Sequence, residues 1–201
     1  MPLPKTLLFL VAMVVLSLRA QAEGAVVVKF GGKVLFGTSP GTILAKSGTH
    51  IPPDTLINTY AKNAFVVLRT PKGSLVKLEG GHAVYREEKA TVIDLVVGAL
   101  FAVAKPHLTE PVLEVRTRST VMGVRGTEFF VQETLKYSYL CVCEGVVRAA
   151  KRADARQTKD VKAGYDLHAT QEQNLAEPSE ASEAMLNMAK KGIAEMSEGS
   201  K

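Results

Sequence analysis

Short runs of β-forming residues, separated by glycine or proline, occupy most of the chain between residues 24 and 170. In residues 75–78 and 112–116, apolar and polar side chains alternate, so each strand would turn one apolar face toward a core. Residues 95–103 are almost continuously apolar, which is typical of a strand buried on both faces. The pattern predicts about ten short strands, at residues 25–30, 34–36, 64–69, 75–78, 92–97, 100–103, 112–116, 129–132, 139–143 and 146–149.

Turn chemistry between these runs predicts that the strands are joined directly rather than through helices. Gly31-Gly32, Gly80-Gly81 and Gly98 fall between runs, and glycine readily adopts the positive φ angles that tight turns need. No repeat of fixed length is visible in the sequence, so a regular solenoid with a consensus repeat is not indicated. The sequence therefore predicts an all-β domain, either β-solenoid-like or a sandwich.

The composition changes after Ala169, where a polar stretch leads into a helical pattern. An apolar stripe with helical spacing follows Pro178-Ser179 and consists of Ala181, Met185, Met188, Ala189, Ile193 and Met196. Ser179 is the expected N-cap, and Gly192 weakens such a helix by about 1 kcal/mol relative to alanine. We expect this short C-terminal α-helix to pack on the β domain or to fray in solution, rather than to dock on a partner.

The first 22 residues have the pattern of a cleaved secretory signal. Lys5 provides the positive charge, residues 7–18 form an apolar run, and Ala20-Gln21-Ala22 matches a cleavage site. An uncleaved anchor would need about 20 apolar residues to span a bilayer, and this run is shorter. We therefore expect a signal peptide (1–22), a β domain (23–170) and a polar linker with a helical tail (171–201), with no membrane span after cleavage.

The charge of the chain is mildly positive, with 25 lysine and arginine residues against 20 aspartate and glutamate residues. The basic residues are scattered among the predicted strands and aromatic residues make up only 6% of the chain, unlike the basic stripe of a nucleic-acid-binding protein. The pattern favours a solvated basic surface, with affinity for an anionic wall polymer or lipid surface as the alternative. We expect no nucleic-acid partner.

The sequence lacks the local signatures of an enzyme or of a metal protein. It contains no nucleophile elbow, phosphate-binding loop or dinucleotide fingerprint. The histidines are dispersed without metal-ligand spacing, at His50, His82, His107 and His168. We therefore expect no catalysis, no metal site and no cofactor.

Two cysteines, Cys141 and Cys143, are two residues apart in a predicted strand, so their side chains point to the same face. Their Cα atoms would lie about 6.5 Å apart, at the far edge of disulfide geometry. The sequence favours two buried thiols. A strained disulfide in an oxidising compartment is the second interpretation and metal binding is the third.

The most distinctive segment spans residues 121–131, with an apolar lead-in, an arginine between two glycines and a β-forming run. It resembles the V-R-G-T-x-F signature of the FecR family, and the residues that carry the resemblance are Gly123, Val124, Arg125, Gly126, Thr127 and Phe129. Further similar positions are residues 47–59, 70–78 and 98–103, Glu144 and Gly145 in an E-G-x-V pattern, and Ala163-Gly164. The resemblance covers about residues 24–170, and Lys72 departs from it by replacing an acidic or amide residue.

Membership of this family would imply a periplasmic, non-enzymatic β domain that receives a signal from an outer-membrane transporter or binds envelope components. Family members that regulate iron uptake carry a cytoplasmic anti-sigma segment and a membrane helix before this domain. Because a signal peptide is predicted here instead, we do not expect this chain to hold a cytoplasmic sigma factor.

Arg125 invites a structural interpretation. Its guanidinium would bind strand-end carbonyls or pair with Glu128 or Glu144, and so hold the turn before Phe129. Buried, paired arginines usually organise folds, so we favour this role over direct contact with a ligand. Thr127 would then be a turn hydroxyl and not a nucleophile.

The leading functional hypothesis is a binding or sensing module in envelope or iron-uptake signalling. Its partner would be an envelope protein, either a TonB-dependent transporter or an inner-membrane regulator. The alternative is a cell-wall carbohydrate-binding or scaffold protein that binds peptidoglycan. This alternative depends on tyrosines that would stack on sugars if they were exposed together, namely Tyr60, Tyr85, Tyr137, Tyr139 and Tyr165.

Overall fold

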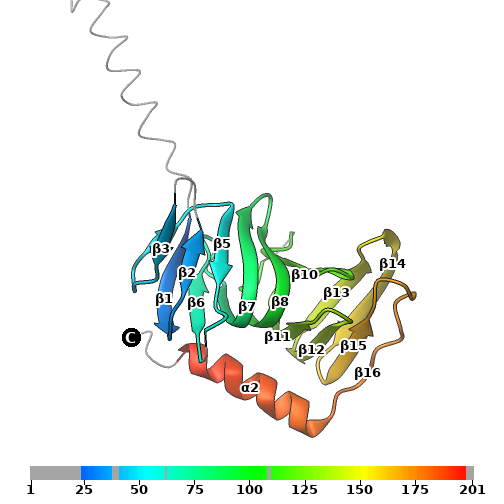
Figure 1. The fold of residues 1–201 in the computed structure, drawn as a ribbon. Helices are drawn as coiled ribbons and strands as arrows, with labels where there is room; N and C mark the ends of the chain where they lie inside the picture. Colours follow the sequence, from blue (N-terminus) through cyan, green and yellow to red (C-terminus); the bar gives the residue numbers. More distant parts are fainter. Residues whose placement is uncertain (1–23, 38–40, 62, 108–109, 198–201) are drawn as a thin grey trace, which may run out of the picture.

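The computed structural model describes residues 24–37, 41–61, 63–107 and 110–197, and the predicted signal peptide lies outside them. These residues form one sheet of 16 strands and a C-terminal helix (Figure 1). The elements are β1 (Ala25–Gly31), β2 (Leu35–Gly37), β3 (Thr42–Leu44), β4 (His50–Ile51), β5 (Thr55–Asn58), β6 (Phe65–Arg69), β7 (Leu75–Glu87), β8 (Thr91–Val103), β9 (Leu113–Arg116), β10 (Thr120–Val124), β11 (Glu128–Glu133), β12 (Ser138–Glu144), β13 (Val146–Lys151), β14 (Asp154–Lys162), β15 (Tyr165–Ala169), β16 (Ser179–Glu180) and α2 (Glu183–Ser197). The predicted all-β class with a C-terminal helix is confirmed.

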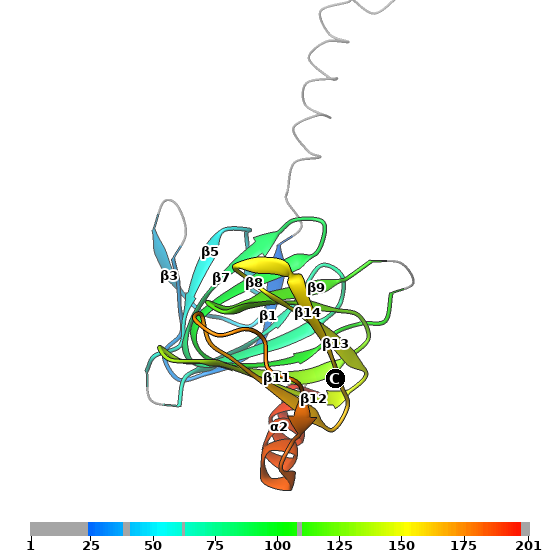
Figure 2. The ribbon, with the colours of Figure 1, turned by 90° about the vertical axis from the view of Figure 1, so that its right-hand side faces the viewer.

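The sheet folds back on itself into two layers around a common core (Figures 1 and 2). The long antiparallel hairpin of β7 and β8 belongs to both layers. The first half of β7 pairs with β6 and its second half with β5, while the first half of β8 pairs with β9 and its second half with β11. The first layer therefore includes β1, β6, β11, β12 and β15, and the second includes β2, β5, β9, β10 and β13.

Glycines allow this hairpin to bend from one layer into the other. A Cβ atom at Gly81 would lie only 1.9 Å from the carbonyl oxygen of Val97, and Gly98 has a φ of +112°. The register between β7 and β8 shifts between Glu79 and His82, next to these glycines. The sequence predicted breaks at these glycines, but the strands continue through them. As a result β7 and β8 each span 13 residues, and the described residues hold 16 strands rather than about ten.

After β8 the chain alternates between the layers in hairpins. The β9–β10 hairpin lies in the second layer, β11–β12 in the first, β13–β14 in the second and β15–β16 in the first. A regular solenoid would instead contribute a single strand to each layer in every turn. The architecture is therefore an unclosed sandwich built from alternating hairpins.

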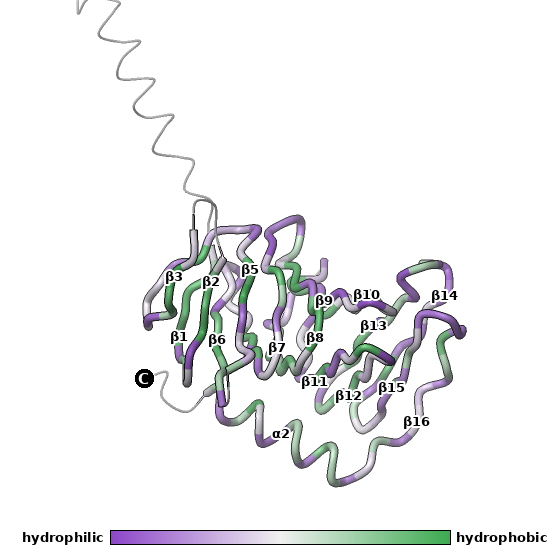
Figure 3. Tube along the Cα trace, viewed as in Figure 1, coloured by the Kyte–Doolittle hydropathy of each residue, from purple (hydrophilic) through white to green (hydrophobic). Residues whose placement is uncertain are grey.

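The core between the layers follows from the strict alternation of side chains along a strand. In β11, Phe129 and Val131 point into this core, whereas Phe130 points outward. The largest side chains that are fully buried in it include Phe36, Ile57, Tyr85, Leu100, Leu113, Met122 and Phe129. Each contributes about 1.5–3 kcal/mol of burial free energy, so this core is the main source of stability. Hydrophobic strands contrast with the hydrophilic β14 at the edge (Figure 3).

The helix α2 covers the outer face of the first layer, across β7, β8, β11 and β12 (Figure 1). We call this surface the covered face; it is made of Val67, Phe101, Phe130, Tyr139 and Cys141 and packs against Ala189, Ile193 and Met196 of the helix. This second apolar layer explains why the end of β8 is apolar on both faces. Of the two expectations for this helix, packing on the β domain or fraying in solution, the structure shows packing.

Two features allow the helix to approach closely. A Cβ atom at Gly192 would lie 2.3 Å from the Phe101 ring, so the glycine that weakens the isolated helix makes room for this ring. Beneath the helix, the ammonium group of the buried Lys77 lies 2.9 Å from Glu195 and 3.1 Å from Glu79. It also lies 5.1 Å from the centre of the Phe101 ring. The charged Lys77 side chain therefore holds α2 to the sheet within an otherwise apolar contact.

The start of the helix differs from the prediction. Ser179 lies in β16, where its hydroxyl donates a hydrogen bond to Asp166, and it does not cap the helix. The cap is Ser182, whose hydroxyl accepts a hydrogen bond from the amide of Met185 and whose carbonyl accepts one from Leu186. The prediction placed the cap about one turn too early, because Ser179 and Ser182 are each followed directly by a glutamate and both lie near the start of the apolar stripe.

Candidate functional site

The segment around Arg125 forms the connection that carries the chain from β10 in the second layer to β11 in the first. Gly126 has a φ of +66° and its amide donates to the carbonyl of Lys105 at 3.2 Å. The carbonyl of Thr127 accepts a hydrogen bond from the amide of Ala104 at 2.9 Å. The crossing therefore stacks on the chain that leaves β8 after its last residue, Val103.

Gly145 forms the next crossing, from β12 to β13, and lies directly against the first. A Cβ atom at Gly145 would come within 2.8 Å of both the Gly126 carbonyl oxygen and the Thr127 methyl carbon. The carbonyl of Gly145 accepts a hydrogen bond from Ala163, which begins the crossing from β14 to β15. Successive crossings thus form a stack, and glycine is required where two backbones touch.

This stack shows where the predicted motif residues lie. Val124 and Phe129 are buried in the core, and Thr127 is buried in the crossing. Arg125 and Glu144 are exposed, so Arg125 is not a buried arginine but stands in a surface turn after the core-facing Val124. Its expected role in holding this turn stays a prediction. The motif therefore builds the crossings of the fold, while its arginine faces solvent.

The outer face of the second layer is a sheet surface that carries charged side chains. Alternation places Arg86 of β7, Asp94 of β8, Glu114 and Arg116 of β9 and Arg148 of β13 on this surface, which we call the open face. None of these residues was singled out from the sequence. Their outward positions in the alternating strands were the available signal, but their mutual contacts depend on strand pairing.

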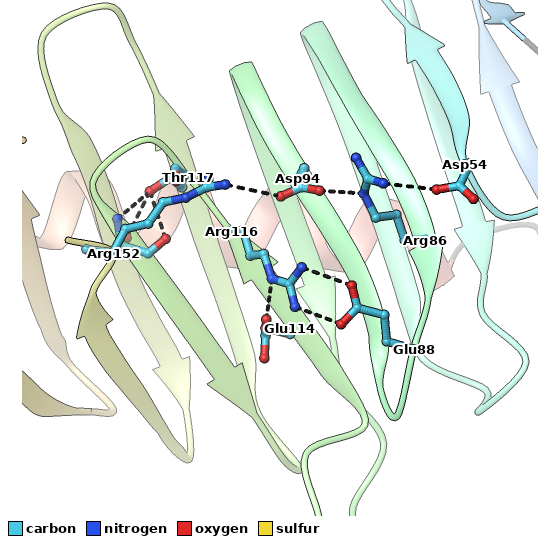
Figure 4. Close-up of polar contacts among 9 residues, drawn as sticks. Asp54, Arg86, Glu88, Asp94, Glu114, Arg116, Thr117 and Arg152 are labelled. Carbon is cyan, nitrogen blue, oxygen red and sulfur yellow. Dashed lines mark hydrogen bonds and ion pairs between the residues drawn. The ribbon is translucent and has the colours of Figure 1, made fainter. Parts of the chain in front are cut away.

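One chain of contacts on the open face is centred on Asp94 (Figure 4). Arg86 donates to Asp94 at 2.8 Å through Nε and to Asp54 at 3.0 Å through Nη1. On the other side, a guanidinium nitrogen of Arg152 lies 4.0 Å from Asp94, and this arginine also donates to the carbonyl of Thr117 at 2.6 Å. These contacts join the β4–β5 turn, β7, β8 and the β13–β14 turn.

A second group is centred on Arg116 (Figure 4). Its two terminal nitrogens donate to both carboxylate oxygens of Glu88, at 3.0 and 2.9 Å, and its Nε donates to Glu114. The hydrogen bonds from Arg116 hold the pKa of Glu88 below its usual value. Such solvent-screened pairs add little to the stability of the fold, but they hold charged groups in fixed positions.

Comparison with known families addresses the region that contains the crossings. Residues 56–148 match the model of the family described as FecR protein. These residues belong to the FecR family. The FecR segment is narrower than the resemblance expected from the sequence, and it runs from β5 to β13. It includes the crossings at Gly126 and Gly145 and the open-face residues Arg86, Asp94 and Arg116.

Solved structures support the fold of the FecR segment and its surroundings. Two crystal structures of proteins from Parabacteroides distasonis, each provisionally described as an anti-sigma factor, match with TM-scores of 0.50 and 0.51 and sequence identities of 16% and 15%. Each match covers 61% of this chain but only 57% of the other protein. At this identity the likeness concerns the fold. No curated protein sequence matches the chain.

The tyrosines of the carbohydrate alternative do not come together around the FecR segment. Tyr85 and Tyr139 are buried, with exposed fractions of 0% and 4%. Tyr60 is exposed beside His82, whereas Tyr137 lies beside His168. The five rings therefore do not form one stacking platform.

A buried carboxyl group lies at the end of the FecR sandwich, where the turns gather. Glu133 is 1% exposed and accepts a hydrogen bond from Ser138, while Arg118 lies 3.8 Å from its other oxygen. Burial raises the pKa of Glu133, and Ser138 and Arg118 oppose that shift. Glu133 and Arg118 line a cavity of about 310 Å³ beside Tyr137. The sequence analysis did not select this acid, because nothing in its neighbourhood marks it as buried.

Two further observations concern metals and membranes. Among the described residues, no group of three or more histidine, cysteine, aspartate or glutamate side chains is arranged to hold a metal ion. In the same part of the chain, no helix is both long and apolar enough to cross a membrane.

Proposed function

We propose that this chain is an exported, non-enzymatic FecR-type module that recognises a regulatory protein partner through its open face. The observation that carries the proposal is the difference between the two outer faces. The chain's own helix occupies the covered face, whereas the open face presents oriented arginine and carboxylate groups. Arginine in such arrays is enriched at protein interfaces because its planar group recognises carboxylates specifically.

The chemistry of the open face favours a folded protein over a glycan as the partner. Ion-paired groups of both signs lie close to partly exposed apolar side chains, for example Leu56 (43% exposed) and Val96 (41% exposed). Such a mixture suits a protein surface of complementary charge, which fixes the orientation of binding and increases the association rate. We propose that this partner is a protein of the cell envelope, either a TonB-dependent transporter or an inner-membrane regulator.

Site-specific photocrosslinking in the cell envelope tests this function. A benzoylphenylalanine at Val96 should yield a discrete adduct with one of these membrane proteins, identified by mass spectrometry. The matched position is Met188 on α2, also exposed, which should yield no such adduct. Arg116→Glu should weaken the Val96 adduct at least about tenfold, because it reverses a charge at the interface. Equal adducts from both positions, or adducts with no envelope protein, would contradict the proposal.

Export and peptidoglycan binding have separate tests. Export predicts that the mature chain begins at Glu23, which intact-mass spectrometry of the envelope fraction will show. The alternative function predicts sedimentation of the chain with purified peptidoglycan. If that sedimentation survives Arg116→Glu and 0.5 M salt while no protein adduct forms, the carbohydrate-binding function replaces the proposed one.

A further inference from the structure

The proposed function uses neither the cysteines of β12 nor one end of the sandwich. Cys141 and Cys143 are free cysteines in the apolar contact with α2, the first buried and the second partly buried. At the end of the sandwich, the β9–β10 turn of the second layer meets the β11–β12 turn of the first and the linker after β15. These three segments line a cavity of about 310 Å³, which is the size of a small-ligand site.

Glu133, the last residue of β11, lines this cavity with a carboxyl group that is only half satisfied. It is 1% exposed, and its Oε2 accepts a hydrogen bond from Ser138, whose hydroxyl lies 2.9 Å from that of Thr117. Its Oε1 is buried, and no described residue donates a hydrogen bond to it. A buried carboxyl oxygen without a donor is unfavourable, so a ligand that brings a donor would complete the site.

Arg118 of the β9–β10 turn lies beside this oxygen without a hydrogen bond to it. Its Nε is 3.8 Å from Oε1 of Glu133, beyond hydrogen-bond distance. Its Nη1 donates to the carbonyl of Leu135 at 3.2 Å. A guanidinium carries five N–H donors in a planar fork, and 33% of this side chain is exposed. The arginine can therefore rotate about its own bonds and offer donors to a second group.

The charges around the cavity select a ligand that carries both signs. A cation alone would be repelled by Arg118 and Lys136. An anion alone would be repelled by Glu133 and Glu172, which line the same cavity. An α-amino acid holds an ammonium and a carboxylate on one carbon atom. Its ammonium can donate to Oε1 of Glu133 while its carboxylate accepts from the planar fork of Arg118, and both are strong, charge-assisted hydrogen bonds.

Neighbouring features bear on the rest of the ligand. The exposed side chains of Leu135 and Tyr137 line the same cavity, so an apolar ligand side chain would bury surface against them. A second cavity, of about 380 Å³, is lined by Arg152 and shares Arg118 with the first. The carboxylate end of the ligand would therefore lie toward a basic region, away from Glu133.

We propose that this cavity binds a free α-amino acid with an apolar side chain, with its ammonium group on Glu133 and its carboxylate on Arg118. None of the residues that line the cavity belongs to the open face, so the site adds a small-molecule ligand to the protein partner proposed above. Rotation of Arg118 admits the ammonium group, while Ser138 and Thr117 keep the carboxyl group in place.

Isothermal titration calorimetry of the purified chain with L-leucine tests the ligand. We expect one saturable site per chain, with a Kd below about 1 mM. N-acetyl-leucine lacks the ammonium group and leucinamide lacks the carboxylate, so each should bind at least about tenfold more weakly. Failure of leucine to saturate a site, or binding of either analogue as tight as that of leucine, would overturn the proposal.

Two substitutions test the residues. Arg118→Gln and Glu133→Gln should each weaken leucine binding at least about tenfold, because each removes the charge that pairs with one end of the ligand. The matched control is Arg148→Gln, which removes an exposed arginine of the open face and should leave leucine binding unchanged. Undiminished leucine binding in either cavity variant would contradict the assigned contacts.

A measurement on the unaltered chain covers the case in which Glu133→Gln disturbs folding. In NMR spectra, addition of leucine should shift the backbone amide signals of residues 117–119, 133–137 and 170–173, because these residues surround the cavity. The amide signals of β3 and α2 should stay in place. Shifts confined to other segments, or spread evenly over the chain, would rule out this site.

Discussion

The two outer faces of this sandwich are built from the same long hairpin, yet they differ in everything that concerns binding. On the covered face, outward positions of β8 and β11 carry Phe101 and Phe130, whose ring centres lie 4.8 Å apart beneath α2. On the open face, outward positions of β8 and β9 carry Asp94 and Arg116. Because backbone pairing is alike in both layers, side chains at outward positions decide which face is closed by the chain and which is left for a partner.

The two faces also differ in how they expose two basic side chains of the same strand, Lys77 and Arg86. Both are basic residues of β7, on either side of its bend. Lys77 lies under the helix with 7% of its side chain exposed, whereas 42% of the Arg86 side chain is exposed. The first charge therefore helps to anchor the helix in a dry contact, where loss of a partner is costly, and the second is screened by solvent.

The largest effect should come from emptying the covered face. Phe101→Ala should destabilise the fold by about 3–5 kcal/mol, because it leaves a cavity between α2 and β8. Val96→Ala, in the same strand but partly exposed on the open face, should cost less than about 0.5 kcal/mol. Urea unfolding followed by circular dichroism measures both. Similar losses in the two variants would mean that α2 does not seal the first layer.

The interior between the faces should respond to pH through Glu133. Burial raises the pKa of this acid in the folded state, so the folded chain binds its proton more tightly than the unfolded chain. The free energy of unfolding should therefore fall as the pH rises from the unfolded pKa through the folded one. Urea unfolding at a series of pH values measures this slope.

Glu133→Gln should flatten that slope in the acidic range. Glu172→Gln, an exposed change beside the same cavity, should leave it unchanged. A slope that persists in Glu133→Gln would assign the pH response to another group.

The next largest effect should come from a variant that weakens the contact between α2 and the covered face. Glu195→Gln removes one of the two carboxylates that face the buried Lys77, and should weaken the helix contact by about 1 kcal/mol. Hydrogen exchange should become faster in α2 and in the parts of β8 and β11 beneath it, but not in β9 or β10. Glu183→Gln, in the exposed first turn of α2, is the matched control and should leave the exchange beneath the helix unchanged.

The smallest effect on stability should come from the open face. Arg116→Ala removes the contacts to Glu88 and Glu114 and should cost only about 0.2–1 kcal/mol, and less in high salt. Arg148→Ala, which breaks the more exposed pair with Asp160, should cost less still. Urea unfolding at low and high salt compares them. A loss above about 2 kcal/mol for Arg116→Ala would mean that the open face is a structural element, not a surface kept for a partner.

Several elements could be predicted from the sequence because their causes are local. Glycine and proline mark the turns, and apolar alternation marks strands such as β9. The helical stripe of α2 follows from its own spacing, and the short segment around Gly126 carried the resemblance to the FecR family. The sequence pattern was wrong about one local feature. It predicted strand ends at Gly80, Gly81 and Gly98, whereas these glycines form bends within the paired strands β7 and β8.

The alternation of apolar residues in the sequence determined the β class, the core-facing positions and the presence of a terminal helix, since each depends on neighbours a few residues away. Tertiary structure alone decided which face is covered. The contact between Lys77 and Glu195 joins residues 118 positions apart, and the open-face contacts join separate strands in the same way. Such contacts depend on how strands pair and how a helix docks, and no short window of sequence contains that information.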